Sequence, residues 1–284
     1  MHMDIDDQLI SENLKNFDRS SYLACLLMGD PHRLPIAVLY AFHAEVSRIR
    51  DMIREPLPGE IRLQWWREVT AEYARKDEAS ANPLSNALNQ VIERYDLNRV
   101  SFDGYCRARI FDLYDDPMPD FATYEGYCGE TASILMQLSC QIISSEHAKF
   151  AASTSGHAGV AYSVATHLLR LADHRARGQL YIPLELLNET GLDRESFLKG
   201  VDEARNAEVI REFASYGENH LRKAREYARD ISPVLSDAFL RMANCDSIFK
   251  RASKFGARCL VESCAPSGLK NQWDLWRTSR RGIF

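Results

Sequence analysis

Apolar residues between Leu39 and Ile53 recur at alternating intervals of three and four positions. They are Leu39, Phe42, Val46, Ile49 and Ile53. Because an α-helix has 3.6 residues per turn, this spacing places all five side chains on one face. The same spacing recurs along most of the chain, and the strict alternation of a half-buried strand is absent from the sequence. The sequence therefore predicts an all-α protein.

A polar stripe lies beside this apolar face. It consists of His43, Ser47, Arg50, Asp51 and Arg54. Residues three and four positions apart are neighbours on a helix, so these side chains share a surface. Two interpretations are open: the stripe lines a cavity between helices, or it is an ordinary solvated face.

The stretch from Gly156 to His174 has the same two-sided pattern. Its apolar face consists of Val160, Val164, Leu168 and Leu171. The polar residues beside that face are Thr166, Arg170, Asp173, His174 and Arg177. Two helices of this kind in one chain favour a cavity between them.

Turn and capping signals predict further helices on both sides of these two. The expected ranges are 8–28 with a cap at Asp18, 61–73, 83–95, 101–114, 124–144, 193–231 and 234–263. In the range 61–73, apolar residues at strict four-residue spacing predict a buried face with Trp65 in the core. We expect one domain over residues 1–284, with a helical and flexible tail at 265–284.

Composition excludes several classes of protein. The net charge of −5 gives no reason to expect nucleic acid as a partner. No run of 18 apolar residues predicts a membrane span, and the acidic N-terminus does not resemble a secretion signal. The seven cysteines form no CxxC pair, which favours buried, reduced thiols and a cytoplasmic location.

Six segments, in this order, resemble the squalene/phytoene synthase family over nearly the whole chain. They are Ser20-Ser21-Tyr22, Tyr40-Ala41-Phe42, Trp65-Trp66-Arg67, Tyr127-Cys128-Gly129-Glu130-Thr131-Ala132, the helix Gly159–Arg170, and Arg177-Gly178-Gln179-Leu180-Tyr181-Ile182-Pro183. The resemblance implies a single large helical bundle of the isoprenoid synthase type around a central cavity. It also implies an activity, the head-to-head joining of two prenyl diphosphates on magnesium ions held by two Asp-rich helices.

The chain departs from the family at those Asp-rich motifs. The three Asp positions of the first motif hold Ser47, Arg48 and Asp51. Counted back from Pro183, the two Asp positions of the second motif hold Arg170 and His174. One carboxylate among several cations is a poor ligand set for magnesium, which prefers several oxygen ligands. Asp51 is thus the candidate catalytic and metal-ligating residue, and Mg²⁺ is expected only if the chain is an active enzyme.

The cations that replace the Asp pairs allow another chemistry. Arg48, Arg170, His174 and Arg177 are candidates to bind a phosphate or diphosphate directly through charge-assisted hydrogen bonds. The alternative is that Arg170 and Asp51 form an ion pair between helices. Further candidate substrate-binding residues on the cavity wall are Tyr22, His43, Ser47, Tyr127 and Tyr181. For His43 and His167 we favour a role in the cavity wall over catalysis, and for Tyr127 and Tyr181 a packing role.

Within the family, this pattern of losses resembles the branch that contains a mitochondrial complex I assembly factor. We therefore expect a non-catalytic or non-canonical member that binds an isoprenoid or lipid-like ligand and assists respiratory complex assembly. One alternative is an active prenyl-diphosphate transferase. The other is a helical interaction module whose filled core has no cavity large enough for a prenyl chain.

The C-terminal residues combine aromatic and basic side chains. They are Trp273, Trp276, Arg277, Arg280 and Arg281. Such a segment suits contact with an anionic membrane surface, which would make the protein peripheral to the inner membrane. An ordinary solvated chain end is the alternative.

Overall fold

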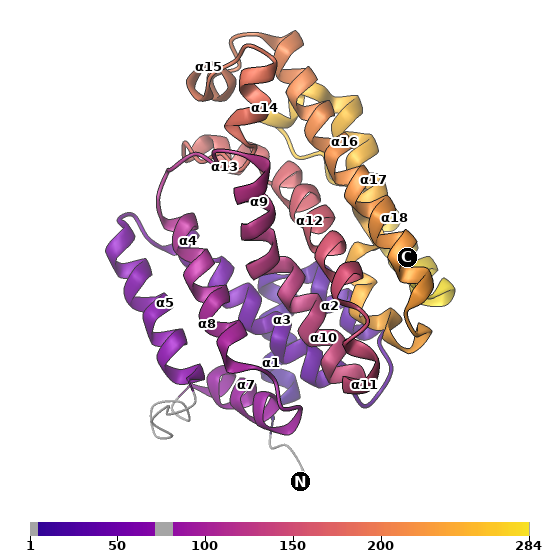
Figure 1. Ribbon diagram of the computed structural model, residues 1–284. Helices are drawn as coiled ribbons and strands as arrows, with labels where there is room; N and C mark the ends of the chain where they lie inside the picture. The colour runs from indigo at the N-terminus through magenta and orange to yellow at the C-terminus, as the bar shows by residue number, and fades with distance from the viewer. Residues whose placement is uncertain (1–4, 72–81, 284) are drawn as a thin grey trace.

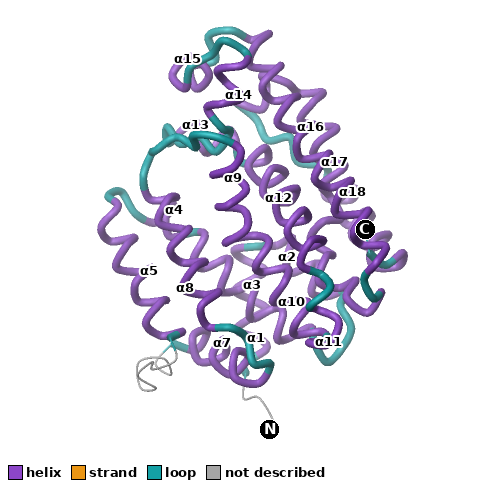
Figure 2. The backbone as a smooth tube through the Cα atoms, viewed as in Figure 1, coloured by secondary structure: helices purple, strands orange, loops and turns teal. Residues whose placement is uncertain are grey.

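The computed structural model describes residues 5–71 and 82–283, and all of its regular structure there is helical. Figures 1 and 2 show a bundle whose helices run mainly along the long axis of the molecule. This confirms the all-α class. No helix in the described ranges is both long and apolar enough to span a membrane.

The N-terminal part of the chain forms the first helices of the bundle. Its elements are α1 (Asp7–Phe17), α2 (Arg19–Leu26), α3 (Arg33–Ser47), α4 (Ile49–Met52), α5 (Pro56–Thr70), α7 (Pro83–Arg94), α8 (Arg99–Ala108) and the 3₁₀ segment η1 (Arg109–Leu113). Asp18 caps α2 as expected, because its side chain accepts a hydrogen bond from the Ser21 amide. Asn82 caps α7 in the same way through Ser85.

The middle of the chain adds further helices to the bundle. They are α9 (Phe121–Cys128), the π-helical segment η2 (Gly129–Ser133), α10 (Ile134–Ile143), α11 (Ser145–Ala148), α12 (Ala152–Leu169) and α13 (Leu171–Ala176). The range 124–144, expected to be one α-helix, thus contains a π-helical turn.

The C-terminal third packs against α12. It contains α14 (Leu184–Glu189), α15 (Arg194–Lys199), α16 (Glu203–Tyr227), η3 (Ala228–Asp230), η4 (Pro233–Asn244), α17 (Cys245–Phe255), η5 (Gly256–Leu260) and α18 (Gly268–Arg281). The long helix α16 lies along α12 and α17, and α18 lies along η4. The tail is helical in the structure, with Asp274 and Leu275 buried.

Two groups of buried side chains form the core. One gathers around α3, α7 and α8, and the other around α12, α16 and α17. All seven cysteines are buried and none forms a disulfide, which confirms the expected free thiols. Where these two cores meet, the helices α3 and α12 bring their polar stripes together.

The buried face of α5 differs from the one that the sequence predicts. Trp66 is buried together with Leu63 and Val69, whereas Ile61 is exposed and Trp65 is half-buried. Tyr73, the last residue of the expected stripe, lies outside the described residues. A strict four-residue step advances 40° past a full turn each time, so the predicted stripe winds away from the core.

Candidate functional site

A polar pocket lies between the two core groups. It is walled by α3 and α4, by η1, by α9 and η2, and by α12, α13 and the segment after it. The lining residues are His43, Ser47, Arg50, Asp51, Arg109, Asp112, Tyr127, Thr131, Ala132, Tyr162, Ser163, Thr166, His167, Arg170, His174, Arg177, Gln179 and Tyr181. Its volume is about 90 Å³.

The first polar stripe forms one wall of this pocket. The α3 helix ends at Ser47, and after Arg48 the short helix α4 carries Asp51. Four of the five stripe residues line the pocket, and only Arg54 is exposed outside it. The structure therefore supports the interpretation of this stripe as a cavity wall.

The second polar stripe forms the facing wall in a similar way. The α12 helix ends at Leu169, and α13 starts again after Arg170, so the chain changes direction at that residue. Thr166, Arg170, His174 and Arg177 line the pocket, whereas the Asp173 side chain is 71% exposed and lies outside it.

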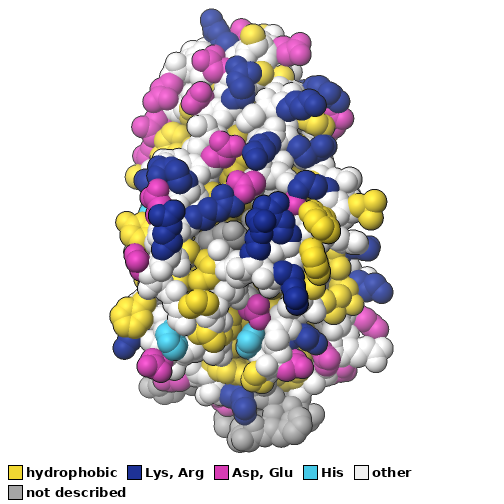
Figure 3. All heavy atoms as spheres, turned by 90° about the vertical axis from the view of Figure 1, so that its right-hand side faces the viewer, with side chains coloured by type: hydrophobic (Ala, Val, Ile, Leu, Met, Phe, Trp, Pro, Cys, Tyr) yellow, Lys and Arg dark blue, Asp and Glu magenta, His cyan; other side chains and the backbone are white. Residues whose placement is uncertain are grey.

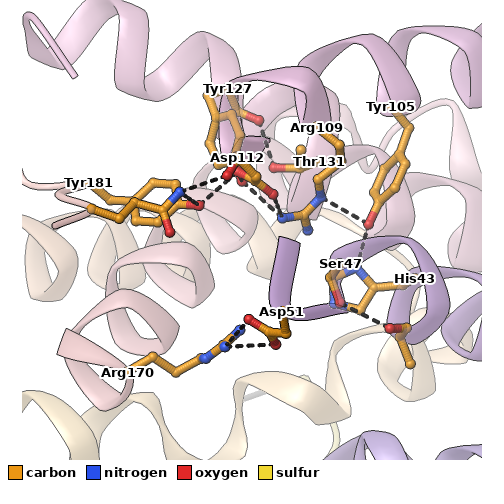
Figure 4. Close-up of polar contacts among 12 residues, drawn as sticks. His43, Ser47, Asp51, Tyr105, Arg109, Asp112, Tyr127, Thr131, Arg170 and Tyr181 are labelled. Carbon is orange, nitrogen blue, oxygen red and sulfur yellow. Dashed lines mark hydrogen bonds and ion pairs between the residues drawn. The ribbon is translucent and has the colours of Figure 1, made fainter. Parts of the chain in front are cut away.

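Asp51 joins the two walls. Its carboxylate lies 3.1 Å from the Arg170 guanidinium (Figure 4). It also forms an ion pair with Arg177. The structure thus contains the ion pair between helices that the sequence left as an alternative. The Asp51 and Arg170 side chains are each about one-third exposed, so this contact lies towards the mouth of the pocket.

A second carboxylate, Asp112, lies deeper and was not identified from the sequence. Its side chain is 8% exposed and accepts hydrogen bonds from Arg109 at 2.9 Å, Tyr127 at 2.7 Å and Tyr181 at 2.8 Å. Figure 4 shows these three donors converging on it from separate segments. The available signal was an Arg and an Asp three positions apart in an otherwise apolar turn, which suits a buried ion pair.

The hydrogen bonds continue from Arg109 towards α3. The Arg109 Nε donates to the Tyr105 hydroxyl at 3.2 Å, and that hydroxyl lies 2.7 Å from Nδ1 of His43. Burial lowers the pKa of His43 well below its ordinary value. His43 is therefore a neutral wall residue at neutral pH, as the sequence suggested.

Two further histidines pack against Tyr181. The His167 ring stacks on the Tyr181 ring at 4.1 Å between centroids, and the His174 ring lies 4.8 Å away. Burial, with the charges of Arg170 and Arg177, lowers the pKa of His174 to about 3. Burial also raises the pKa of Tyr127 and Tyr181 well above its usual range. These rings are neutral, so the charge of the pocket comes from its arginines and aspartates.

Two of the expected substrate-binding residues lie elsewhere. Tyr22 is half-buried and packs against the N-terminal core. Arg48 stacks on the Phe17 ring, 3.5 Å from its centroid, and lies 3.9 Å from Glu45. Neither lines the pocket. Arg48 occupies the junction between α3 and α4, and it turns towards α1 instead of α12.

The pocket does not fit a magnesium cage. Its wall carries two carboxylates, Asp51 and Asp112, and both already form ion pairs with arginines. No cluster of three or more acidic, His or Cys ligands exists in the part of the chain that the structure describes. Four guanidinium groups in the same wall would repel a divalent cation.

The same donor set suits a small anion. The pocket wall has four guanidinium groups against two carboxylates, and its histidines are neutral. The Nε atoms of Arg50 and Arg177 are buried without a hydrogen-bond partner among the described residues. Buried donors of this kind normally have a partner, so an anionic oxygen would satisfy them.

The size of the pocket limits the ligand. Pockets that enclose drug-sized molecules measure about 300–1,000 Å³, and this one measures about 90 Å³. This volume is large enough for a small headgroup and too small to enclose a prenyl chain. In this respect the structure agrees with the alternative of a filled core.

Comparisons with known proteins agree with the family resemblance and with the fold. A model of the family described as "Squalene/phytoene synthase" matches residues 14–270. The human NADH dehydrogenase (ubiquinone) complex I assembly factor 6 is 26% identical over 250 residues, which cover 87% of this chain and 74% of that protein. Presqualene diphosphate synthase of Rhodopseudomonas palustris is 30% identical over 175 residues, 61% of either chain. A crystal structure of a dehydrosqualene synthase in complex with ligand superposes with a TM-score of 0.75 at 16% identity, over 96% of this chain and 95% of that one.

Proposed function

This chain belongs to the squalene/phytoene synthase family, and we propose that it is a non-canonical member that binds an anionic, lipid-like ligand without magnesium. Its second proposed role is to assist the assembly of a respiratory complex. One observation carries the first part: Asp51, the carboxylate retained from the first motif, forms ion pairs with Arg170 and Arg177.

These ion pairs compete with metal binding. A divalent ion at Asp51 would have to displace two guanidinium groups and then lie beside them. At an effective dielectric constant of 20, two unit charges 4 Å apart interact by about 4 kcal/mol, and a divalent ion doubles that repulsion. An anion meets the opposite field, because both guanidinium groups attract it.

The proposed ligand carries a phosphate or diphosphate group on an isoprenoid or other lipid-like body. Its headgroup would contact Arg50, Arg170 and Arg177, where two buried Nε donors have no partner among the described residues. The pocket of about 90 Å³ encloses only this headgroup, so the apolar part of the ligand would extend beyond the pocket.

The assembly role rests on the relatives. The human assembly factor matches over most of this chain, and homologous factors from cattle and Dictyostelium discoideum match over similar lengths. The pocket is compatible with this role because binding a lipid-like ligand needs no turnover.

The alternative function is head-to-head condensation of two prenyl diphosphates. The observation in its favour is the similarity to a presqualene diphosphate synthase. This alternative requires Asp51 to act with Mg²⁺, so that Asp51→Ala abolishes turnover.

One experiment separates the two functions. Purified protein is incubated with labelled farnesyl and geranylgeranyl diphosphate, with Mg²⁺ or with EDTA, and hydrocarbon products and bound ligand are both measured. We expect bound ligand in EDTA and no product in either buffer. A metal-dependent C30 or C40 product would overturn the proposal, and so would binding that requires Mg²⁺. Circular dichroism shows that the preparation is folded.

The assembly role is tested in the organism that makes the protein. Deletion of the gene is expected to lower the amount of assembled complex I on a native gel, and the wild-type gene is expected to restore it. Unchanged complex I after deletion would contradict this part of the proposal and leave the ligand part intact.

A further inference from the structure

The outer face of α18 carries large apolar side chains. Leu269, Trp273, Trp276 and Arg280 follow one another at intervals of four, three and four residues, so they share one side of the helix. Leu269 is 83% exposed, Trp273 56% and Trp276 49%. The two indole rings lie 5.1 Å apart and form one exposed aromatic surface.

Polar contacts hold the inner face of the same helix. Asp274 accepts a hydrogen bond from Ser247 at 2.7 Å and forms an ion pair with Lys270, and Asn271 accepts one from Asn244. Leu275 is the one apolar residue of α18 that is buried. Packing alone favours burial of Trp over Asp and Asn, so this arrangement is the reverse of an ordinary amphipathic helix.

A basic groove runs beside this aromatic surface. It measures about 190 Å³ and lies between α18, α17 and η4, with five basic residues in its wall. They are Arg225, Lys250, Lys270, Arg277 and Arg281. Figure 3 looks onto this side of the molecule and shows basic side chains gathered around its centre, with apolar side chains next to them.

Several of these cations have no internal counter-charge. The two carboxylates of the groove, Asp246 and Asp274, are paired with Arg225 and Lys270. Lys250, Arg277 and Arg281 form no ion pair within the described ranges, and Arg280 on the outer face forms none there either. An exposed aromatic surface on α18 therefore lies next to unpaired cations of the same helix, with Lys250 of α17 beside them.

We infer that α18 docks the protein onto an anionic lipid bilayer. Indole rings favour the headgroup region, because they are apolar with one polar N–H. Arginine and lysine side chains beside them bind lipid phosphates, and each adds attraction to an anionic surface. Trp273 and Trp276 would insert between headgroups, while Lys250, Arg277, Arg280 and Arg281 contact the phosphates.

The chemistry favours a bilayer over a nucleic acid. The chain as a whole has a net charge of −5, and acidic residues line the groove among the basic ones. A polyanion that follows a groove would meet those carboxylates. A bilayer meets only the protruding side of α18, where the tryptophans lie and the cations are unpaired.

The test uses the full chain and vesicles of two compositions. In flotation assays, we expect binding to phosphatidylcholine vesicles that contain 30% phosphatidylserine, and little binding to pure phosphatidylcholine. Trp273→Ser with Trp276→Ser is expected to weaken binding at least tenfold. Arg277→Gln, Arg280→Gln and Arg281→Gln together are expected to weaken it by roughly fivefold per charge, and high salt is expected to do the same.

Phe150→Ser is the matched control, because Phe150 is an aromatic residue, 64% exposed, that lies beside Lys149 away from α18. Its binding is expected to equal that of the wild type. Quenching of wild-type tryptophan fluorescence by brominated lipids provides a measurement that needs no variant.

Three results would overturn the inference. They are equal binding to both vesicle types, unchanged binding of both α18 variants, and tighter binding to duplex RNA than to the anionic vesicles. No residue of α18 lines the central pocket, so failure here would leave the proposed ligand binding intact.

Discussion

The carboxylate of Asp51 and the guanidinium of Arg170 lie 3.1 Å apart although 119 positions separate them in the sequence. The resemblance to the family aligns Asp51 with the first Asp-rich motif and Arg170 with the second. It implies that an active member would hold metal between carboxylates at these two positions.

Asp51→Asn is expected to strengthen binding of inorganic pyrophosphate by about tenfold, since it frees two guanidinium groups to donate charge-assisted hydrogen bonds. The loss of unfolding free energy is expected to stay below about 1 kcal/mol, because the pair is partly exposed. Calorimetry in EDTA measures the affinity. Glu146→Gln, at an exposed carboxylate outside the pocket, is the control with unchanged affinity. Weaker binding by Asp51→Asn would show that this carboxylate does not compete with the anion for the two guanidinium groups.

The triple variant Ser47→Asp, Arg170→Asp and His174→Asp restores carboxylates at the motif positions. In the wild type, added Mg²⁺ is expected to weaken pyrophosphate binding, because the metal competes for the anion. In the variant, Mg²⁺ is expected to strengthen it, because facing carboxylates now hold the ion. Titrations of pyrophosphate with and without Mg²⁺ show whether the metal strengthens or weakens binding. The single variant Arg170→Asp serves as the comparison. If Mg²⁺ changes pyrophosphate binding in the same direction in all three proteins, this account of the site is contradicted.

Acid is expected to destabilise the protein through His174. Its pKa falls from an ordinary 6.5 to about 3 on folding, so between these values the unfolded chain binds a proton that the folded chain does not. The contribution of neutral His174 to the free energy of unfolding is therefore complete above pH 6.5, and it is lost as the pH drops towards 3. At pH 4.5 this residue alone costs about 2–3 kcal/mol.

His174→Gln is expected to remove that part of the pH dependence, seen in urea unfolding at pH 7 and pH 4.5. His147→Gln, at a half-buried position outside the pocket, is the control, with the pH dependence of the wild type. An equally steep loss of stability in His174→Gln would rule out His174 as its source.

Asp112→Asn is expected to lower the free energy of unfolding by about 3–5 kcal/mol, because it leaves the buried Arg109 guanidinium without a counter-charge. Thermal unfolding monitored by circular dichroism measures the loss. Asp103→Asn breaks the ion pairs with Arg67 and Arg107 at a site that is 36% exposed, and it is expected to cost about 1 kcal/mol or less. Similar losses in both variants would show that burial of the Asp112 pair contributes nothing.

Gly159→Ala is expected to destabilise the protein by about 1–3 kcal/mol, because a Cβ at this position of α12 would collide with the Ser133 backbone in η2. Gly156→Ala, one turn earlier in the same helix, places its Cβ in open space. It is expected to stabilise the protein by about 0.5–1 kcal/mol, as alanine favours helix. Chemical denaturation compares the two, and a neutral Gly159→Ala would mean that α12 and η2 can move apart.

Periodicity predicted the helical class and both polar stripes, because amphipathic spacing is a local property of the sequence. It did not predict the breaks at Arg48 and Arg170, since neither position contains Gly or Pro. Nor did it predict the π-helical turn at 129–133, where tertiary packing against α12 determines the local geometry.

The Asp112 cluster was beyond sequence reasoning for a different reason. Arg109 is a local partner, but Tyr127 and Tyr181 come from segments 15 and 69 positions away from Asp112. No local sequence pattern predicts that these donors converge on Asp112. The position of the Arg48 side chain outside the pocket could not be predicted from local sequence either, because its contact with Phe17 depends on how α1 packs on α3.

The ion pairs of Asp51 also limit which single substitutions the pocket can accept. Restoring a single motif carboxylate at position 170 would remove one guanidinium and place a second negative charge beside Asp51, with too few ligands to hold a metal. A lone Asp at position 174 would bury a carboxylate among aromatic rings. Each single substitution towards a metal-binding set of carboxylates is thus unfavourable by itself, and a metal site forms only when several are combined. The ion pairs of Asp51 therefore oppose any one-step conversion of this cationic pocket into a metal site.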